Sequence, residues 1–386
     1  MFINRFNLYK KTMNVKEIQA KSILRKHSKI DSWFISRYGM NLYRGCAHNC
    51  VYCDGRSEKY KVEREFGNTV EVKINAIEIL KKELDNKRKR VPLKKGYIMV
   101  GGGVGDSYQP VEKKYELTRK TLELLYEKNF PVHILTKSTL VERDLDILKK
   151  INKKTRTIVS FSFSSADEKI SSIFEPGVPS PDSRFKTIEF LKNNGITCGI
   201  FLLPVIPFIT DKKEIMQHTM KRACDVGIDF IIFGGMTLKD GRQKEYFFKT
   251  LKKYYPDLFT DYLNIYKSSK WGMATSDYYD SINQTFNVIA KYYKIPRRIP
   301  QKFFNDILDE NDLVTVILEH LDYLLNLEGK RSSYRWAANS ISKLQKPLSC
   351  MKNDLQKIRG VGPKTERIIL DIISTGSSKY YEKLMG

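Results

Sequence analysis

The chain has 386 residues, of which 41% are hydrophobic and 12% aromatic, which is enough to bury a core and excludes a disordered or fibrous protein. Its 68 Lys and Arg against 44 Asp and Glu give a formal charge of +24, which favours a polyanionic partner, although a lysine-rich surface without one explains the excess equally well. Long apolar runs and the features of a signal peptide are both missing, so we expect a cytoplasmic protein with no membrane partner.

The chain is predicted to begin with a basic extension, residues 1–38, that carries a helix over 15–27. Residues 39–238 alternate apolar strands with amphipathic helices. The expected strands are 40–44, 97–103, 132–136, 157–163, 197–206 and 229–234, and the expected helices are 72–84, 113–127, 145–151, 183–193 and 212–224. This alternation predicts an α/β fold in which helices cover a parallel sheet, as an incomplete barrel of six β/α units.

The strand pattern stops after about residue 239, and the rest of the chain is predicted to be all-α. Residues 239–309 form a helical extension rich in Tyr, Phe and Lys, with a boundary marked by the prolines of 294–300. Residues 310–386 form a small helical domain.

Three of the six cysteines, Cys46, Cys50 and Cys53, lie close together in the sequence. Thiolates at this spacing can each bind one iron of a cubane cluster, which leaves the fourth iron open to an outside ligand. The alternative is zinc, but a closed zinc site needs four ligands. His48 could serve as the fourth only by folding back inside the loop, and no second CxxC occurs, so we favour a cluster.

With Tyr52 before the last cysteine, this segment resembles the signature of the radical S-adenosylmethionine (SAM) superfamily. The resemblance implies a partial β/α barrel with the cysteine loop after its first strand. It also implies a [4Fe-4S] cluster whose open iron chelates the amino and carboxylate groups of SAM. An electron donor such as ferredoxin or flavodoxin then reduces the cluster, and SAM is cleaved to a 5′-deoxyadenosyl radical.

Further segments within about residues 38–235 resemble the spore photoproduct lyase-like group. They are NLYRGC at 41–46, GDSYQPVE at 105–112, ILTKS at 134–138, RD at 143–144, EP at 175–176, and Arg184. Photoproduct lyases return a hydrogen atom through a cysteine near the end of the glycine-containing strand, and this chain has none there. Cys198 and Cys224 are predicted to be buried thiols, so neither replaces that cysteine. Tyr108, in the loop after the glycine-containing strand, is therefore the residue that we predict to relay hydrogen at the open end, or mouth, of the barrel.

The candidate cofactor-binding residues lie mostly at the ends of predicted strands. They are Tyr52, Gly101, Gly102, Gly103, Lys137, Ser138, Ser160, Ser162 and Arg184. Glycines allow a close approach of backbone and ligand, although a simple turn would also use them, and by resemblance this strand meets the methionine amino group. Lys137 is placed to pair with the cofactor carboxylate. Ser160 and Ser162 share one face of a buried strand and need polar partners, which a cofactor or solvent at the strand end would supply.

Near the C-terminus, residues 355–370 read as a helix, a tight turn with Gly360 and Gly362, and a second helix. The turn exposes backbone N–H groups at a helix N-terminus, which suits a phosphate, and Lys364 and Thr365 can contact the same oxygens. The pattern resembles the helix-hairpin-helix motif, which holds the DNA backbone without reading sequence.

The resemblance extends over about residues 310–386 to the small N-terminal domain of DNA polymerase beta, through segments at 312–318, 328–341 and 374–379. It implies a DNA-binding set of Tyr334, Arg335, Gly360, Gly362, Lys364, Thr365 and Arg367. The position of that domain's lyase lysine is Ile368 here, so binding is implied without lyase chemistry. The alternative is an ordinary helical hairpin that binds no nucleic acid.

Together these patterns predict a radical SAM enzyme that repairs or modifies a base in DNA, after extrusion of that base from the duplex. One alternative is a radical SAM enzyme that modifies tRNA or another RNA. The other is an iron–sulfur DNA-binding protein without catalytic turnover.

Overall fold

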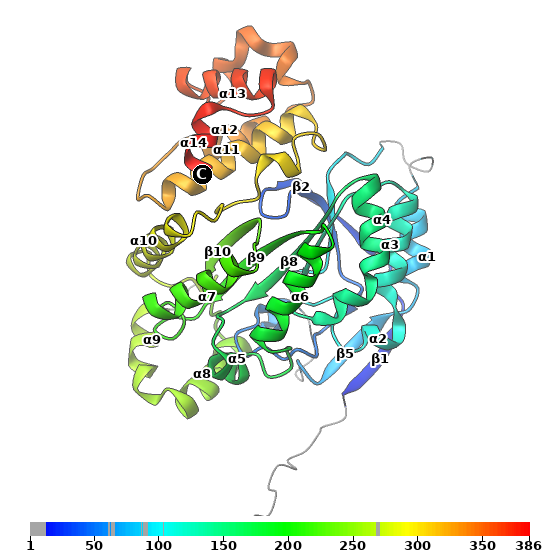
Figure 1. The fold of residues 1–386 in the computed structure, drawn as a ribbon, viewed down its shortest axis with the longest axis vertical. Helices are drawn as coiled ribbons and strands as arrows, with labels where there is room; N and C mark the ends of the chain where they lie inside the picture. The colour runs from blue at the N-terminus through cyan, green and yellow to red at the C-terminus, as the bar shows by residue number, and fades with distance from the viewer. Residues whose placement is uncertain are drawn as a thin grey trace, which may run out of the picture.

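The main sheet has seven strands in the order β10-β9-β8-β7-β6-β3-β2, and it curls into a half-barrel (Figure 1). The computed structural model describes residues 13–60, 62, 66–85, 87, 92–102, 104–267 and 271–386. The strands are β2 (Leu24–Asp31), β3 (Ser36–Met40), β6 (Tyr97–Val100), β7 (Val132–Thr136), β8 (Thr157–Phe163), β9 (Thr197–Val205) and β10 (Phe230–Gly235). Six of them run parallel, and β2 pairs antiparallel with β3 at one edge. The predicted α/β partial barrel is therefore confirmed.

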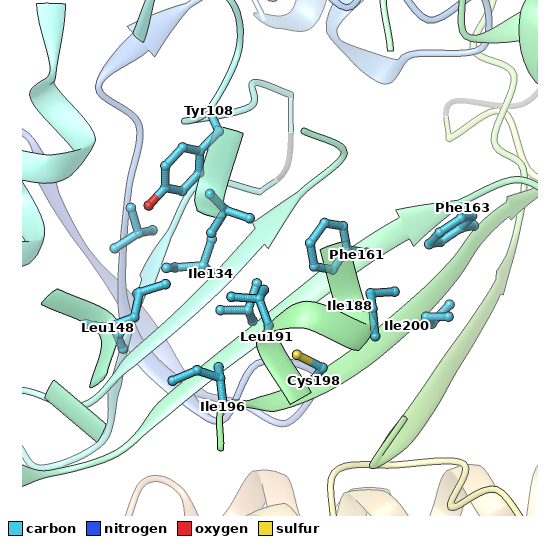
Figure 2. Close-up of a cluster of buried hydrophobic side chains, with 14 of the residues drawn as sticks. Tyr108, Ile134, Leu148, Phe161, Phe163, Ile188, Leu191, Ile196, Cys198 and Ile200 are labelled. Atoms are coloured by element: carbon cyan, nitrogen blue, oxygen red, sulfur yellow. The ribbon is translucent and has the colours of Figure 1, made fainter. Parts of the chain in front are cut away.

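Helices cover the convex side of the sheet. They are α1 (Ala76–Glu83), α3 (Leu117–Glu127), α4 (Leu145–Lys154), α6 (Pro181–Asn193) and α7 (Lys213–Asp225). The short helix α2 (Glu112–Tyr115) precedes α3, and the short helix α5 (Glu168–Phe174) packs with the cysteine loop. Figure 2 shows Ile188 and Leu191 of α6 against Cys198 and Ile200 of β9 in this core. Each fully buried side chain of this size stabilises the fold by about 1.5–3 kcal/mol. Cys198 is buried as predicted, whereas Cys224 on α7 is exposed, because it lies on the solvent side of its helix.

The helix predicted over 15–27 is wrong, because this stretch contributes strands to two sheets. Strand β1 (Asn14–Ile18) pairs in parallel with β5 (Thr69–Lys73), which also pairs with β4 (Tyr43–Arg44) in a small second sheet. Strand β2 follows and borders the main sheet. Pairing with distant partners thus overrides a local pattern that favours a helix. The predicted helix at 72–84 starts later, at Ala76, for the same reason.

The C-terminal part of the chain is helical, as predicted. Its helices are α8 (Arg242–Tyr254), α9 (Phe259–Ile265), α10 (Ser276–Tyr292), α11 (Glu310–Asn326), α12 (Tyr334–Ile341), α13 (Pro363–Thr375) and α14 (Lys379–Met385), with a 3-10 segment at Leu348–Lys357. Figure 1 shows α11 to α14 gathered at one end of the molecule. None of the helices in the described ranges is both long and apolar enough to cross a bilayer. The domain boundaries at 38, 238 and 309 remain predictions.

The last four helices close the base of the barrel, which we define as the end where the parallel strands begin. Ile158, Phe201 and Phe230 of the sheet share one hydrophobic cluster with Val314 and Ile317 of α11. Two polar contacts reinforce this junction. The buried Arg37 of β3 pairs with Asp312, and His320 lies 3.0 Å from the carbonyl oxygen of Ser32 through Nε2. The helical domain is therefore packed onto the barrel through a common core.

Candidate functional site

Cys46, Cys50 and Cys53 meet at the mouth of the barrel, which we define as the end where the parallel strands finish. They line one cavity of about 100 Å³, together with Gly102, Lys137 and Ser162. Cys46 and Cys50 are only 7% and 6% exposed. The cysteine loop, the glycine strand and two further strand ends therefore line a single cavity.

The thiols fit a cubane cluster better than a zinc ion. Within the described ranges no three His, Cys, Asp or Glu side chains are arranged to hold a metal ion, whereas in a cubane each thiolate binds a separate iron. His48, the fourth ligand of the zinc alternative, uses both ring nitrogens elsewhere: Nδ1 lies 2.9 Å from the Gly177 oxygen and Nε2 lies 3.1 Å from Asp106 Oδ2. Burial raises the pKa of all three thiols, that of Cys50 to about 12, so binding of a cluster would release protons.

The cysteine loop is seated on the segment after α5. The Gly177 N–H donates to the carbonyl oxygen of His48 at 3.0 Å. A Cβ at Gly177 would lie 2.5 Å from the Ala47 oxygen and 2.8 Å from the His48 oxygen, so only glycine allows this approach. From within the loop, Arg56 Nε donates to the Cys50 oxygen at 3.0 Å. These contacts hold the loop against the segment after α5.

Glu175 is the centre of a buried polar network behind the cavity. Its carboxylate accepts hydrogen bonds from Arg184 Nη2 at 2.7 Å, from Lys137 Nζ at 3.1 Å and from the Tyr52 hydroxyl. Burial alone raises the pKa of Glu175, but Arg184 and Lys137 lower it more, and it lies below its usual range. Lys137 Nζ also donates to Ser162 Oγ at 2.8 Å. One carboxylate thus faces two cations in this network, and a second carboxylate, Asp106, lines the cavity itself.

A second buried carboxylate, Asp106, supports the other side of the loop. It accepts from Thr136 Oγ1 at 2.8 Å, from the Lys137 N–H at 2.7 Å and from the Tyr108 N–H at 2.8 Å, and it faces His48 as described. Burial raises the pKa of Asp106, but His48 and these N–H donors lower it overall. The carboxylate therefore stays charged and ties the end of β7 to the cysteine loop.

The predicted cofactor-binding residues do not all reach the cavity. Gly102 lines it with a φ of +93°, a conformation that favours glycine, whereas Gly103 lies outside the described residues. Gly101, at φ +81°, adjoins the Leu135 carbonyl instead. Ser138 Oγ accepts from the Leu140 N–H at 3.2 Å and so caps the next turn.

Two further candidates are occupied by protein partners. Ser160 Oγ lies 2.7 Å from His133 Nε2, deeper in the barrel than the cavity. Arg184 is fully buried, with Nη1 donating to the Ser162 oxygen at 2.7 Å besides its contact with Glu175. Arg184 therefore acts on the cavity through Glu175 and Ser162.

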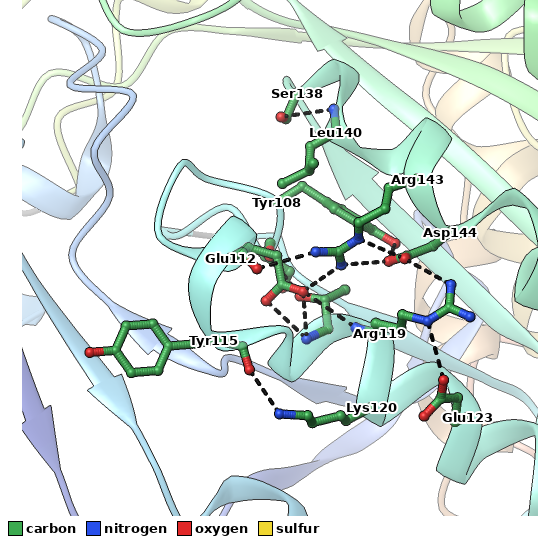
Figure 3. A network of polar contacts seen from close by, with 12 residues as sticks. Tyr108, Glu112, Tyr115, Arg119, Lys120, Glu123, Ser138, Leu140, Arg143 and Asp144 are labelled. Atoms are coloured by element: carbon green, nitrogen blue, oxygen red, sulfur yellow. Dashed lines mark hydrogen bonds and ion pairs between the residues drawn. The ribbon is translucent and has the colours of Figure 1, made fainter.

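The prediction that Tyr108 lies at the mouth is wrong. Its side chain is fully buried, and its hydroxyl donates to Asp144 Oδ2 at 3.0 Å in the network of Figure 3. Arg143 joins this network, with Nε 2.8 Å from Asp144 Oδ1 and Nη2 2.7 Å from Glu112 Oε1. Because the loop turns the ring back into the helix-facing core (Figure 2), we assign Tyr108 no part in hydrogen relay. The motifs at 105–112 and 143–144 hold the loop in place instead.

The hairpin of the C-terminal domain separates the predicted DNA-binding residues into two sets. Arg335, Lys364 and Arg367 are exposed, whereas Tyr334 and Thr365 are each 4% exposed and pack inside the domain. The exposed set leaves three cations for a phosphate backbone.

The two hairpin glycines also differ in their surroundings. Gly360 has a φ of +92°, and a Cβ there would lie 2.6 Å from the Ala337 nitrogen. Gly362, the residue before α13, has nothing within 4 Å of its Cβ position. The turn therefore requires glycine at Gly360 and leaves space at Gly362.

Glu175 and Asp106 were absent from the candidates derived from the sequence. Both stand in short segments that resemble a known group, at 175–176 and 105–112. The sequence did contain a signal: each of these acidic residues lies next to an apolar strand or helix. An acidic side chain in such a place is seldom buried unless it has a partner. The partners, Arg184 and Thr136, come from other elements and become visible only in the fold.

Comparison with known proteins agrees with this geometry. The Radical SAM superfamily matches residues 40–219, and a helix-hairpin-helix domain family matches residues 309–378. Among solved structures, spore photoproduct lyase complexed with dinucleoside spore photoproduct superimposes with a TM-score of 0.54 at 17% identity, over 72% of this chain and 79% of that chain. A mutant of that lyase with bound AdoMet and the same dinucleoside gives 0.51 at 18% identity, over 70% and 78%. At this identity the likeness concerns the fold.

Curated relatives match about three fifths of the chain. An uncharacterized protein of Methanocaldococcus jannaschii is 30% identical over 223 residues, which is 58% of this chain and 78% of the relative. One of Acidianus two-tailed virus is 29% identical over 252 residues, or 61% and 82%. One of Mycobacterium tuberculosis is 28% identical over 235 residues, or 60% and 67%.

Proposed function

The chain belongs to the radical SAM superfamily, and from this premise we propose that it is an enzyme that cleaves SAM and acts on a base of DNA, in repair or modification. Cys46, Cys50 and Cys53 would hold a [4Fe-4S] cluster, which together with SAM supplies a 5′-deoxyadenosyl radical. The observation that carries the proposal is the single cavity in which these thiols meet Gly102 and Lys137. A helix-hairpin-helix domain on the same chain supports DNA as the substrate.

The residues around the cavity have separate tasks in this proposal. Lys137, held by Glu175 at 3.1 Å and by Ser162 at 2.8 Å, presents an oriented ammonium group to a carboxylate such as that of SAM. Lys137 is the cation that lines this cavity, whereas Arg184 lies behind it and pairs with Glu175. Gly102 brings bare backbone to the same space. The low exposure of Cys46 and Cys50 would limit the access of water to a cluster held there.

The C-terminal domain would hold the DNA backbone. Arg335, Lys364 and Arg367 are exposed on it, and the chain as a whole carries a formal charge of +24. Contacts of this kind bind without reading sequence. A target base must then leave the stack to reach the narrow cavity lined by the cysteines at the mouth. An external reductant such as ferredoxin or flavodoxin would supply the electron.

The test is an assay of 5′-deoxyadenosine formation by anaerobically reconstituted, reduced protein. SAM is added with no nucleic acid, with intact duplex DNA, with ultraviolet-irradiated duplex or with tRNA. Stimulation by irradiated duplex supports repair, and equal stimulation by both duplexes supports modification of an undamaged base. Stimulation by tRNA alone replaces DNA with RNA as the substrate. If an intact cluster gives no 5′-deoxyadenosine under any condition, the enzymatic proposal is overturned.

A further inference from the structure

A large polar groove runs between the edge strand β2 and the helices α11 and α12; we call it the side groove. One part has a volume of about 700 Å³ and is lined by Arg25, Lys26, Trp33, Arg298 and Tyr323, among others. A second part of about 620 Å³ is lined by Arg331 and Trp336, and the two parts share Lys29 and Arg335. The side groove thus leads from the helix-hairpin-helix domain onto the barrel wall.

The direction of β2 shows where the side groove leads. Because β2 is antiparallel to β3, Arg25 lies opposite Gly39, near the mouth, and Asp31 lies opposite Ser36, at the base. Residues of β2 from Arg25 to Asp31 all line the groove. The groove therefore extends along the wall from the base toward the mouth.

Arg298 lies in the side groove as a buried cation without an acidic partner. It is 3% exposed, and its Nε and Nη1 atoms make no hydrogen bond in the described part of the chain. Its guanidinium carbon lies 3.5 Å from the ring centre of Tyr323 and 4.8 Å from that of Trp33. These contacts favour a cation but accept none of its hydrogen bonds. A buried, unpaired guanidinium is costly, so this arrangement fits a site for an anion.

The acidic residues that line the groove are already engaged. Asp31 accepts from the Trp33 N–H at 2.8 Å, and Glu319 pairs with Lys29. Asp322 accepts from the Ser332 hydroxyl and from Asn326 Nδ2 at 3.3 Å. In the described residues none of the three lies within 4 Å of Arg298 as an ion pair. Burial lowers the pKa of Arg298. Asp31 and Glu319 still raise this pKa from a longer distance, but no carboxylate of the described residues accepts a hydrogen bond from its Nε or Nη1. An anion from outside the chain would supply that contact.

We propose that the side groove binds one nucleic-acid strand, with a backbone phosphate on Arg298, and guides it between the helix-hairpin-helix domain and the mouth. This inference rests on the proposed function, because it assumes a nucleic-acid substrate. Phosphate suits a guanidinium, which can offer it two parallel N–H groups. Trp336, 60% exposed at the far end of the groove, offers a face on which a base can stack. Lys26 and Arg335 add exposed cations along the path.

The test measures binding of a fluorescein-labelled single-stranded DNA oligonucleotide by anisotropy, on cluster-loaded protein, over a series of salt concentrations. Arg298→Met is expected to weaken binding roughly tenfold, the low end for a lost hydrogen bond to a charged group. It is also expected to lower the slope of log affinity against log salt by about 0.7, the value for one phosphate contact on a single strand. Arg298→Lys keeps the charge and should retain most of the slope.

Two further variants separate this effect from loss of fold and from general charge. Lys26→Met removes an exposed cation of the groove and should lower the slope similarly with an unchanged melting temperature. Lys186→Met removes one charge from a side chain that is 75% exposed on α6, on the convex side of the sheet, and should leave binding unchanged. A fall in slope with Lys186→Met equal to that with Lys26→Met would overturn the side groove in favour of general charge.

The remaining outcomes distinguish this inference from the proposed function. If the wild-type protein binds DNA and neither Arg298→Met nor Lys26→Met changes the slope, the inference is wrong and the proposed function stands. If the wild-type protein binds no oligonucleotide and DNA leaves 5′-deoxyadenosine formation unchanged, the proposed function fails first. Binding of thymidine 5′-monophosphate that depends on Arg298, with the oligonucleotide unaffected, would assign the groove to a small phosphate ligand instead of a strand.

Discussion

The mouth and the side groove each contain a buried arginine, and the two arginines differ in their partners. Arg184, behind the cysteine cavity, is 0% exposed and pairs with Glu175 at 2.7 Å. Arg298, in the side groove, is 3% exposed and has two aromatic rings beside it but no carboxylate. Arg184 leaves only Nε without a hydrogen bond, whereas Arg298 leaves both Nε and Nη1 without one in the described residues. A charge paired with a carboxylate is held by the protein, whereas a charge without such a pair can accept an anionic ligand. The difference is that the polar network behind the mouth is completed by protein side chains, whereas the arginine in the groove has no carboxylate in contact with it.

The largest expected effect separates the chemistry of the mouth from binding in the groove. Replacing Cys50 with alanine removes one of three thiolates, so we expect 5′-deoxyadenosine formation to be abolished while DNA affinity is retained. The exposed Cys350 offers a matched control, and Cys350→Ala should keep full activity. Both are measured on reconstituted protein by product analysis and anisotropy. Activity in Cys50→Ala would contradict the assignment of the cluster ligands.

A second substitution removes the carboxylate partner of the arginine behind the mouth, so that this arginine becomes like the one in the groove. Glu175→Gln leaves Arg184 buried without a counterion, which we expect to destabilise the protein by about 3–5 kcal/mol, the range for breaking a buried ion pair. Chemical denaturation followed by circular dichroism measures the loss. Asp182→Asn, at an exposed ion pair on the same helix as Arg184, is the control and should have little effect. Equal stability of the two variants would show that Glu175 does not hold this frame.

The pH dependence of stability tests two buried histidines, one in the sheet and one in the helical domain packed against it. Burial lowers the pKa of His133 to about 4, and burial together with Arg298 lowers that of His320 to about 3. The unfolded chain protonates histidine near pH 6.5, so between pH 7 and 5 protons favour unfolding. At about 1.4 kcal/mol per pKa unit, each histidine should cost about 2 kcal/mol of stability over this range.

Urea denaturation at pH 7 and pH 5 measures this dependence. Replacing His320 with glutamine should remove about 2 kcal/mol of it. The exposed His218 supplies the control, and His218→Gln should leave the dependence unchanged. A pH dependence that is the same in all three proteins would locate the acid sensitivity elsewhere.

The smallest expected effect concerns the hairpin that adjoins the groove. Gly360→Ala forces a side chain into a φ of +92° and to 2.6 Å from the Ala337 nitrogen, so we expect a loss of about 1–3 kcal/mol and weaker DNA binding. Gly362→Ala meets no atom within 4 Å and should be tolerated. Thermal unfolding and anisotropy compare the pair. Equal losses in both variants would mean that the hairpin backbone is not fixed by the contact with α12.

The sequence predicted the parts of the fold that depend on local pattern. The apolar runs at 132–136 and 157–163 are strands with those bounds, because their side chains are buried on both faces of a parallel sheet. The helix predicted over 15–27 is wrong, because this stretch forms strands that exist only through pairing with residues 69–73 and 36–40. Local periodicity contains no information about such partners.

The candidate site shows the same division. Cysteine spacing predicted the three thiols that line the cavity, and the ends of the strands predicted Lys137 and Ser162. The direction in which Tyr108 points could not be read from its loop position, since it depends on Asp144 across the core. Likewise, Arg298 gave no signal in the sequence, because an arginine without a partner is recognised only when its surroundings are known.

The common core between the sheet and α11 has a further consequence for a strand held as proposed. Because Phe201 and Ile317 belong to one packed cluster, the hairpin and the cysteine cavity cannot swing independently of each other. The distance between the hairpin and the cysteine cavity would then be fixed. The altered nucleotide would lie at a constant number of nucleotides from the phosphates held by the hairpin, and its position would be set by measurement along the strand rather than by the base sequence around it.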